Sequence, residues 1–267
     1  MDDDAAPRPD EPESPRPGEQ DRPGTPSAAL PHGALPHEFD HRHADVSGGW
    51  LRAAAFGAMD GLVTNTSLLA GVGGAGLAAN EIVLSGIAGL AAGAFSMALG
   101  EYASVSTANN QIDAEVRVER RAQARHPISE QTELVGTFVD MGMTEATART
   151  AAQEVHRDAE QAVTIHLTHE LGVDPTEKPS PLVAGASSFL MFAIGAIIPL
   201  IPYLLGFESL VAGLAVGCVG LLLVGATTSH LTSQPRVRGA LRQLLFGLVA
   251  VGATYLVGLL VGVGVPA

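Results

Sequence analysis

The sequence is poor in cysteine, in aromatic residues and in basic residues. Cys218 is the one cysteine among 267 residues, which excludes a disulfide within the chain. Aromatic residues make up only 4% of the chain, and lysine and arginine number 15 against 28 aspartates and glutamates. The resulting net charge of −13 argues against nucleic acid as a partner, because its phosphates would be repelled, and it favours cationic partners.

Sequence motifs of several enzyme classes are also missing. No Gly-x-x-x-x-Gly-Lys-Ser/Thr loop is present, and the glycine-rich stretch at 71–74 is not followed by lysine, so a phosphate-binding loop of that kind is excluded. No serine–histidine–aspartate or cysteine–histidine arrangement suggests a nucleophile. The opening Met1-Asp2-Asp3-Asp4 lacks the basic and apolar regions of a cleavable signal peptide. We therefore predict a protein that is not an enzyme and that inserts into a membrane through internal segments.

Five apolar segments occupy much of the chain, at about 53–76, 81–103, 182–206, 208–231 and 240–264. Each is close to the ~20 residues that span a bilayer as a helix, and a helix satisfies its own backbone in lipid. The short links at 75–81 and 205–209 predict two helical hairpins. Glycines spaced by four residues suggest close helix contacts, at Gly89 and Gly93, Gly213 and Gly217, and Gly258 and Gly262.

The positions of the basic residues indicate the orientation of the chain in the lipid bilayer. All 15 lysines and arginines precede the first segment, lie between the second and third, or lie between the fourth and fifth. The positive-inside rule places these regions in the cytoplasm. We therefore expect a multi-pass protein of a bacterial cell membrane, with its N-terminus inside and its C-terminus outside.

Four regions follow from this pattern. Residues 1–36 are expected to form a disordered tail of proline and acidic residues, and 37–103 to hold transmembrane helices 1 and 2. Residues 104–178 form a polar insert, and 179–267 hold transmembrane helices 3 to 5. The predicted fold class is all-α: a polytopic membrane protein with five transmembrane helices and a cytosolic helical metal-binding insert between helices 2 and 3.

Three or four helices are expected within the insert. The second transmembrane helix runs on to about Arg125, because no glycine or proline interrupts it after the membrane. Ser129 is a candidate N-cap for a helix with an apolar face made of Leu134, Phe138 and Met141. Thr144 is a candidate N-cap for the next helix, and Gly172 ends the last one.

Three residues suggest a cation path through the membrane. Asp60 lies about a third of the way into the first segment, where a carboxylate costs a few kcal/mol, so a functional or paired role is expected. The alternative is that Asp60 lies near the interface and snorkels to water or caps the helix. Met97 offers a thioether, which suits late first-row metals, although most methionines serve only in packing. Glu101 follows one turn later on the same helix face. Together these side chains would supply oxygen and sulfur ligands.

The insert carries acidic and histidine side chains at helical spacing. These are Glu115 and Glu119, Glu130 and Glu133, and His166 with His169 and Glu170. Such spacing places two ligands on one helix face, as in carboxylate-rich bundles that hold iron or manganese. The alternative is a solvated acidic face. We expect His126 and His156 to be solvated, and metal binding by His37, His41 and His43 is the less favoured interpretation.

Three stretches of the chain resemble the vacuolar iron transporter family. They are Leu51 to Val72, which contains Phe-Gly-Ala-Met-Asp-Gly-Leu-Val; Gly93 to Val105, which contains Ser-Met-Ala-Leu-Gly-Glu; and Pro181 to Tyr203. The similarity covers about residues 37–264, and the chain resembles a bacterial-type member.

The resemblance implies a function and a site. Members of the family form homodimers with five spans per subunit and export Fe²⁺, often with Mn²⁺, from the cytosol in exchange for protons. The pathway lies between the subunits. By motif position, Asp60 and Met97 match the intramembrane metal residues, and the cytosolic metal ligands correspond to Glu119, Glu130, Glu133 and Glu170.

This sequence departs from the family pattern at two places. Ala122 stands where plant members have a glutamate, and His166 and Leu167 replace a methionine pair. These changes leave Mn²⁺ or Zn²⁺ open as ions bound in the insert. Two alternatives to transport remain at this point: a membrane-anchored protein that stores or senses metal, and a di-iron ferroxidase.

Overall fold

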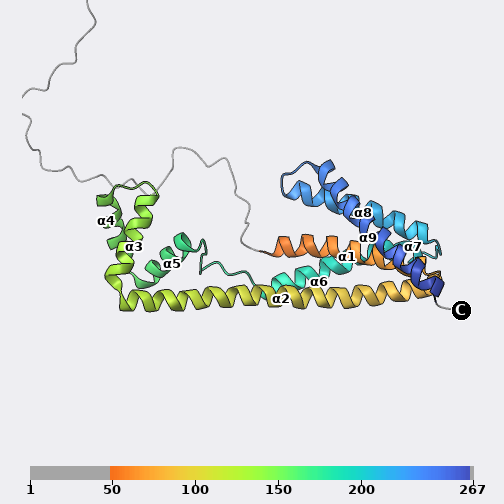
Figure 1. The fold of residues 1–267 in the computed structure, drawn as a ribbon, viewed down its shortest axis with the longest axis horizontal. Helices are drawn as coiled ribbons and strands as arrows, with labels where there is room; N and C mark the ends of the chain where they lie inside the picture. Colours follow the sequence, from red (N-terminus) through yellow and green to blue (C-terminus); the bar gives the residue numbers. More distant parts are fainter. Residues whose placement is uncertain (1–48, 265–267) are drawn as a thin grey trace, which may run out of the picture. The chain divides into compact units, whose positions relative to one another are not determined.

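The structure is a computed structural model that describes residues 49–264, and its regular elements are all helical (Figure 1). The first two helices are α1 (Trp50–Gly74) and α2 (Ala79–Arg125), followed by α3 (Pro127–Asp140), α4 (Glu145–Val155) and α5 (Ala159–Glu170). The chain continues with α6 (Pro181–Ile197), η1 (Ile198–Leu200), α7 (Ile201–Leu204), α8 (Leu210–Leu231) and α9 (Arg236–Gly264). The all-α prediction is confirmed, whereas the predicted tail and His37, His41 and His43 lie outside the described residues.

Four helical segments are long and apolar enough to cross a membrane. They are α2, the 24-residue run Pro181–Leu204, α8, and α9 as far as Gly262. The 25-residue α1 does not reach the same hydropathy, because Asp60 and Asn65 interrupt its apolar sequence. It nevertheless packs against α2, α6, α8 and α9. The chain is therefore a multi-pass membrane protein, and the fifth span stays a prediction.

The predicted continuation of the second span is confirmed. Residues 79–125 form one 47-residue helix, which at 1.5 Å per residue is about 70 Å long. That is more than twice the ~30 Å of a bilayer's hydrocarbon core. The C-terminal part of α2 therefore extends beyond the membrane and carries its carboxylates with it.

Two prolines divide the third apolar segment. The α-helix that begins at Pro181 gives way to the 3₁₀ turn η1 at Pro199, and α7 resumes at Ile201 before Pro202. Proline has no N–H to donate and clashes with the preceding turn, so it interrupts the α-helical hydrogen bonds. The segment keeps its length of 24 residues, but its α-helical hydrogen bonding is interrupted at the prolines.

The membrane helices approach one another through glycines. A Cβ at Gly61 would lie 2.2 Å from the carbonyl oxygen of Phe192, and one at Gly195 would lie 2.3 Å from that of Ala58. These backbones of α1 and α6 leave no room for a side chain, which is how small residues stabilise helix pairs in lipid. A Cβ at any glycine of the three predicted pairs would also lie within 4 Å of another segment of the chain.

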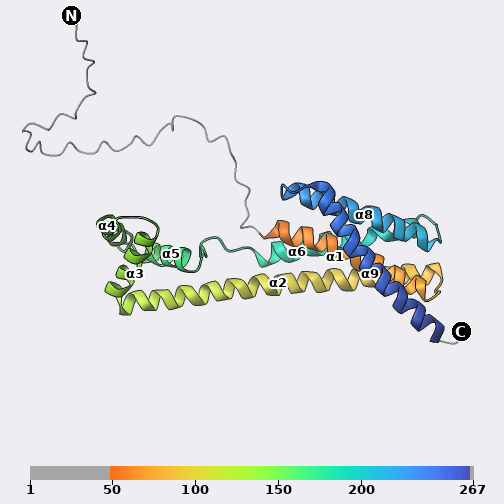
Figure 2. The ribbon, with the colours of Figure 1, turned by 45° about the horizontal axis from the view of Figure 1, so that its top comes forward.

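The insert folds as α3, α4 and α5 beside the C-terminal part of α2 (Figure 2). Its small core consists of Leu134, Val135, Phe138, Ala148 and Ala152. As predicted, Thr144 caps α4 by accepting a hydrogen bond from the N–H of Thr147, and Gly172 follows α5 with a φ of +66°. Two predictions are wrong. His126, not Ser129, precedes α3, because Pro127 starts the helix, and Met141 is exposed.

Candidate metal centre

Glu119, His166 and Glu170 come together where α5 packs on α2. The ligand atoms of the three side chains lie within 4.8 Å of one another. Nδ1 of His166 is 2.7 Å from a carboxylate oxygen of Glu170 and 3.6 Å from one of Glu119. Among residues 49–264, this is the one group of three or more acidic, histidine or cysteine side chains with such geometry.

Local sequence explains how the cluster is positioned. Asp158 caps α5 by accepting hydrogen bonds from the N–H groups of Glu160 and Gln161. One turn of that helix then separates His166 from Glu170, so both lie on one face. Arg120 of α2 forms an ion pair with Glu160 at 2.6 Å, which holds the start of α5 against α2. The packing of α5 on α2 brings this face to Glu119.

Glu119 and His166 are buried, so water screens the charges of the cluster only weakly. His166 has no exposed side-chain surface, and the side chain of Glu119 is only 11% exposed. Gln123 lies one turn after Glu119 and donates a hydrogen bond of 3.1 Å to its carboxylate. Two carboxylates and an imidazole supply oxygen and nitrogen ligands, which suit Fe²⁺, Mn²⁺ and Zn²⁺. The arrangement can therefore hold a divalent cation.

Glu130 extends the negative charge of the cluster from α3. Partial burial raises the pKa of Glu130 above its ordinary value of 4.5, and nearby carboxylates raise it further. Those carboxylates belong to Glu119, Glu133 and Glu170. Glu130 and Glu133 are not among the three grouped residues, so their predicted metal binding stays a prediction.

We expect Glu130→Gln to stabilise the metal-free protein at neutral pH. The folded-state pKa of Glu130 exceeds its unfolded value, so the ionised carboxylate destabilises the fold, and this penalty disappears as pH falls below both values. The thermal midpoint in chelator should therefore be higher for the variant at neutral pH and equal to the parent's in acid. With metal added, the parent should have the higher thermal midpoint. A parental midpoint that equals the variant's at every pH would contradict this electrostatic account.

Three predicted ligands of the insert lie at its edge. Glu115, Glu133 and His169 are exposed. Glu115 borders a groove lined by apolar residues of α2 and α5, and His169 packs edge-on against Phe138 with ring centres 6.3 Å apart. The structure does not place these three in the ligand group, so their metal binding stays a prediction.

Asp60 occupies a face of α1 that the other helices leave uncovered. Arg52, Phe56 and Thr64 are exposed on this face, at intervals of four residues, and Asp60 is half-buried among them. The hydroxyl of Thr64 donates a 3.3 Å hydrogen bond to Asp60. Asn65, in contrast, is fully buried and donates to the carbonyl oxygen of Ala196. The polar residues of α1 therefore divide between two faces of the helix.

The other two intramembrane candidates have protein partners. Met97 is half-buried and packs against the cluster that contains Phe192 and Ala196. Glu101 forms an ion pair with Arg52, which the sequence did not indicate. Glu101 therefore neutralises the charge of Arg52 near the start of α1. Its predicted role as a metal ligand requires Arg52 to move away.

Sequence reasoning missed two residues beside the cluster. Gln123 could have been found from its spacing of four residues after Glu119. His156, which we expected to be solvated, is half-buried, and its ring centre lies 5.4 Å from that of His166. No spacing in the sequence indicates that contact, since it depends on how α4 packs against α5.

Residues 51–259 match the profile of the VIT family. A vacuolar iron transporter of Acanthamoeba castellanii is 31% identical over 227 residues, which is 82% of each chain. Vacuolar iron transporter 1 of Arabidopsis thaliana is 26% identical, with 79% of this chain and 85% of the relative covered. VIT-like transporter 1b of Glycine max is 30% identical, with 77% and 73% covered.

Proposed function

Because this chain belongs to the VIT family of transporters and not to a family of enzymes, we propose that it exports Fe²⁺ and Mn²⁺ from the cytosol in exchange for protons. The observation that carries the proposal is the group of Glu119, His166 and Glu170, of which Glu119 and His166 are buried, beside the long helix α2. The insert captures the cation there. Zn²⁺ is a further ion that this donor set accepts.

The uncovered face of α1 supports a pathway at a homodimer interface. A carboxylate in a membrane span is costly when it faces lipid, and Asp60 and Thr64 face away from the other helices of this protomer. A second copy that packs on this face removes both groups from lipid and lines a polar path between the two α1 helices. Asp60 binds the cation in transit, and its carboxylate takes up a proton when the cation leaves.

The proposed orientation follows from the positive-inside rule. A cysteine placed at Asn80, where α2 begins, is expected to react with an impermeant thiol reagent added outside cells, whereas one at Ala122 reacts only after the membrane is opened. Both are compared in a Cys218→Ser background. Labelling of Ala122→Cys from outside, with no labelling of Asn80→Cys, would show that the orientation is the opposite of the one proposed.

Metal flux into proteoliposomes tests the proposal as a whole. With the insert facing the outer solution, we expect Fe²⁺ and Mn²⁺ to accumulate inside the vesicles, faster when the interior is acidic because protons leave as metal enters. A pH-sensitive dye should report proton release that coincides with metal entry. Stoichiometric metal binding without accumulation would instead identify a storage or sensing protein, the alternative that the sequence left open.

A further inference from the structure

Two buried imidazole nitrogens near the cluster have no partner in the protein. His156 follows the last turn of α4, and His166 lies in α5, with ring planes inclined by 89°. Nε2 of each ring is buried and makes no hydrogen bond. A buried polar atom without a partner costs about 1–3 kcal/mol, so two in adjacent rings indicate that something else satisfies them.

Hydrogen bonds to Nδ1 decide which nitrogen of each ring carries the proton. Nδ1 of His156 is 2.8 Å from the carbonyl oxygen of Ala152, and Nδ1 of His166 is 2.7 Å from a carboxylate oxygen of Glu170. Both oxygens can only accept, so each neutral ring donates from Nδ1. The buried Nε2 atoms therefore present lone pairs, which attract a cation or a hydrogen-bond donor.

The spacing of the rings fits one shared ion. Two imidazoles bound to a tetrahedral cation through nitrogens at about 2.0–2.1 Å have ring centres about 5 Å apart. The observed separation is 5.4 Å. A carboxylate that accepts from the other ring nitrogen, as Glu170 does for His166, is the usual support of a metal-binding histidine.

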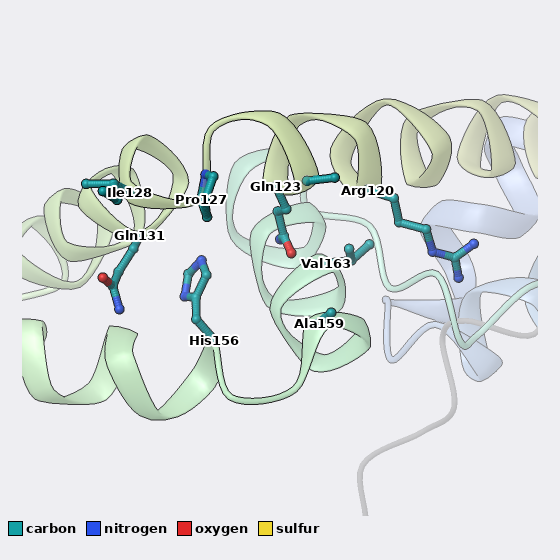
Figure 3. A pocket seen from close by; sticks show the side chains of 9 residues that line it. Arg120, Gln123, Pro127, Ile128, Gln131, His156, Ala159 and Val163 are labelled. Carbon is teal, nitrogen blue, oxygen red and sulfur yellow. The ribbon is translucent and has the colours of Figure 1, made fainter.

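A cavity adjoins the His156 side of the pair. His156 extends into a cavity of about 370 Å³, between Gln131 of α3 and Gln123 of α2 (Figure 3). This volume accommodates a cation with water molecules, and the two amide oxygens are available as further ligands. Arg120 also borders the cavity, but its guanidinium is paired with Glu160, which neutralises its charge there.

We propose that His156 and His166 bind one divalent cation of the Zn²⁺ or Co²⁺ type through their Nε2 atoms, at a second site beside the carboxylate cluster. His166 takes part in the two sites in different ways: its Nδ1–H donates to Glu170, and its Nε2 binds the second cation. The inference rests on the proposed function only in that the insert must meet such cations.

Zinc calorimetry on the full chain in detergent tests the second site. His156→Asn is expected to reduce the number of bound zinc ions by one per chain, while His126→Asn, at an exposed histidine between α2 and α3, leaves the number unchanged. An unchanged number in His156→Asn contradicts the inference. Iron flux of the parent protein is measured in parallel, because its absence contradicts the proposed function and not the second site.

A second variant identifies the ligand directly. His156→Cys places a thiolate beside the cavity, and we expect added Co²⁺ to give thiolate-to-metal charge-transfer absorption that the parent, with only Cys218, lacks. Circular dichroism of both variants checks that the helices are intact. A folded cysteine variant that binds Co²⁺ without this absorption shows that residue 156 does not touch the ion, and it overturns the proposal.

Discussion

Asp60→Asn is expected to abolish Fe²⁺ flux into proteoliposomes while metal capture by the insert stays at the parental level. The amide keeps the size of the side chain and one acceptor oxygen, but it removes the negative charge. A cation in a low-dielectric passage needs that charge, since an uncompensated ion there is very costly. The asparagine also cannot take up a proton when the cation leaves, so proton release in the same vesicles should disappear as well.

The control for this variant is Glu208→Gln, which removes an exposed carboxylate between α7 and α8. It changes the net charge by the same amount and should transport at the parental rate. Calorimetry on the detergent-solubilised Asp60→Asn protein separates transport from capture. Flux at the parental rate in Asp60→Asn would falsify the pathway and leave the carboxylate with a structural role.

Glu119→Gln is expected to remove most of the metal affinity of the insert. Loss of an outer partner of a metal ligand costs about 10–100-fold in affinity, and Glu119 is a candidate ligand itself, so the loss should be at least that large. Its side chain is only 11% exposed, and water therefore replaces the lost carboxylate poorly. Flux at low metal concentration should fall with the affinity, and high concentrations should restore part of it.

Glu115→Gln is the matched control, because Glu115 lies one turn earlier on α2 but is exposed and outside the ligand group. It should bind metal with nearly parental affinity. If both variants lose affinity equally, the insert attracts cations as a diffuse acidic surface. If neither loses affinity, the three grouped side chains are not the capture site.

The histidine at position 166 has consequences for metal preference. Its imidazole approaches Glu170 and Glu119 from within the protein, with no exposed surface of its own. Imidazole suits zinc, iron and nickel, while carboxylates suit manganese and magnesium. A mixed donor set of this kind accepts several first-row ions, so we propose that selection among them falls to the membrane path, where Met97 would offer a soft ligand.

Helical periodicity could predict part of this site. The spacing of His166 and Glu170 places both on one face of any helix, and the structure confirms that they meet. The same rule predicted the pair of Glu115 and Glu119, yet only Glu119 joins the ligand group with the α5 side chains. Periodicity says which residues share a face, but it does not say which of them the neighbouring helix covers.

The sequence by itself determined the helical class, the approximate ends of the apolar segments and the uninterrupted length of α2. Those properties depend on composition and on glycine and proline positions, which act locally. Only the tertiary structure decided that Glu119 meets His166, that Arg52 pairs with Glu101, and that His156 lies against His166. These contacts join residues on different helices, so they depend on how the helices pack.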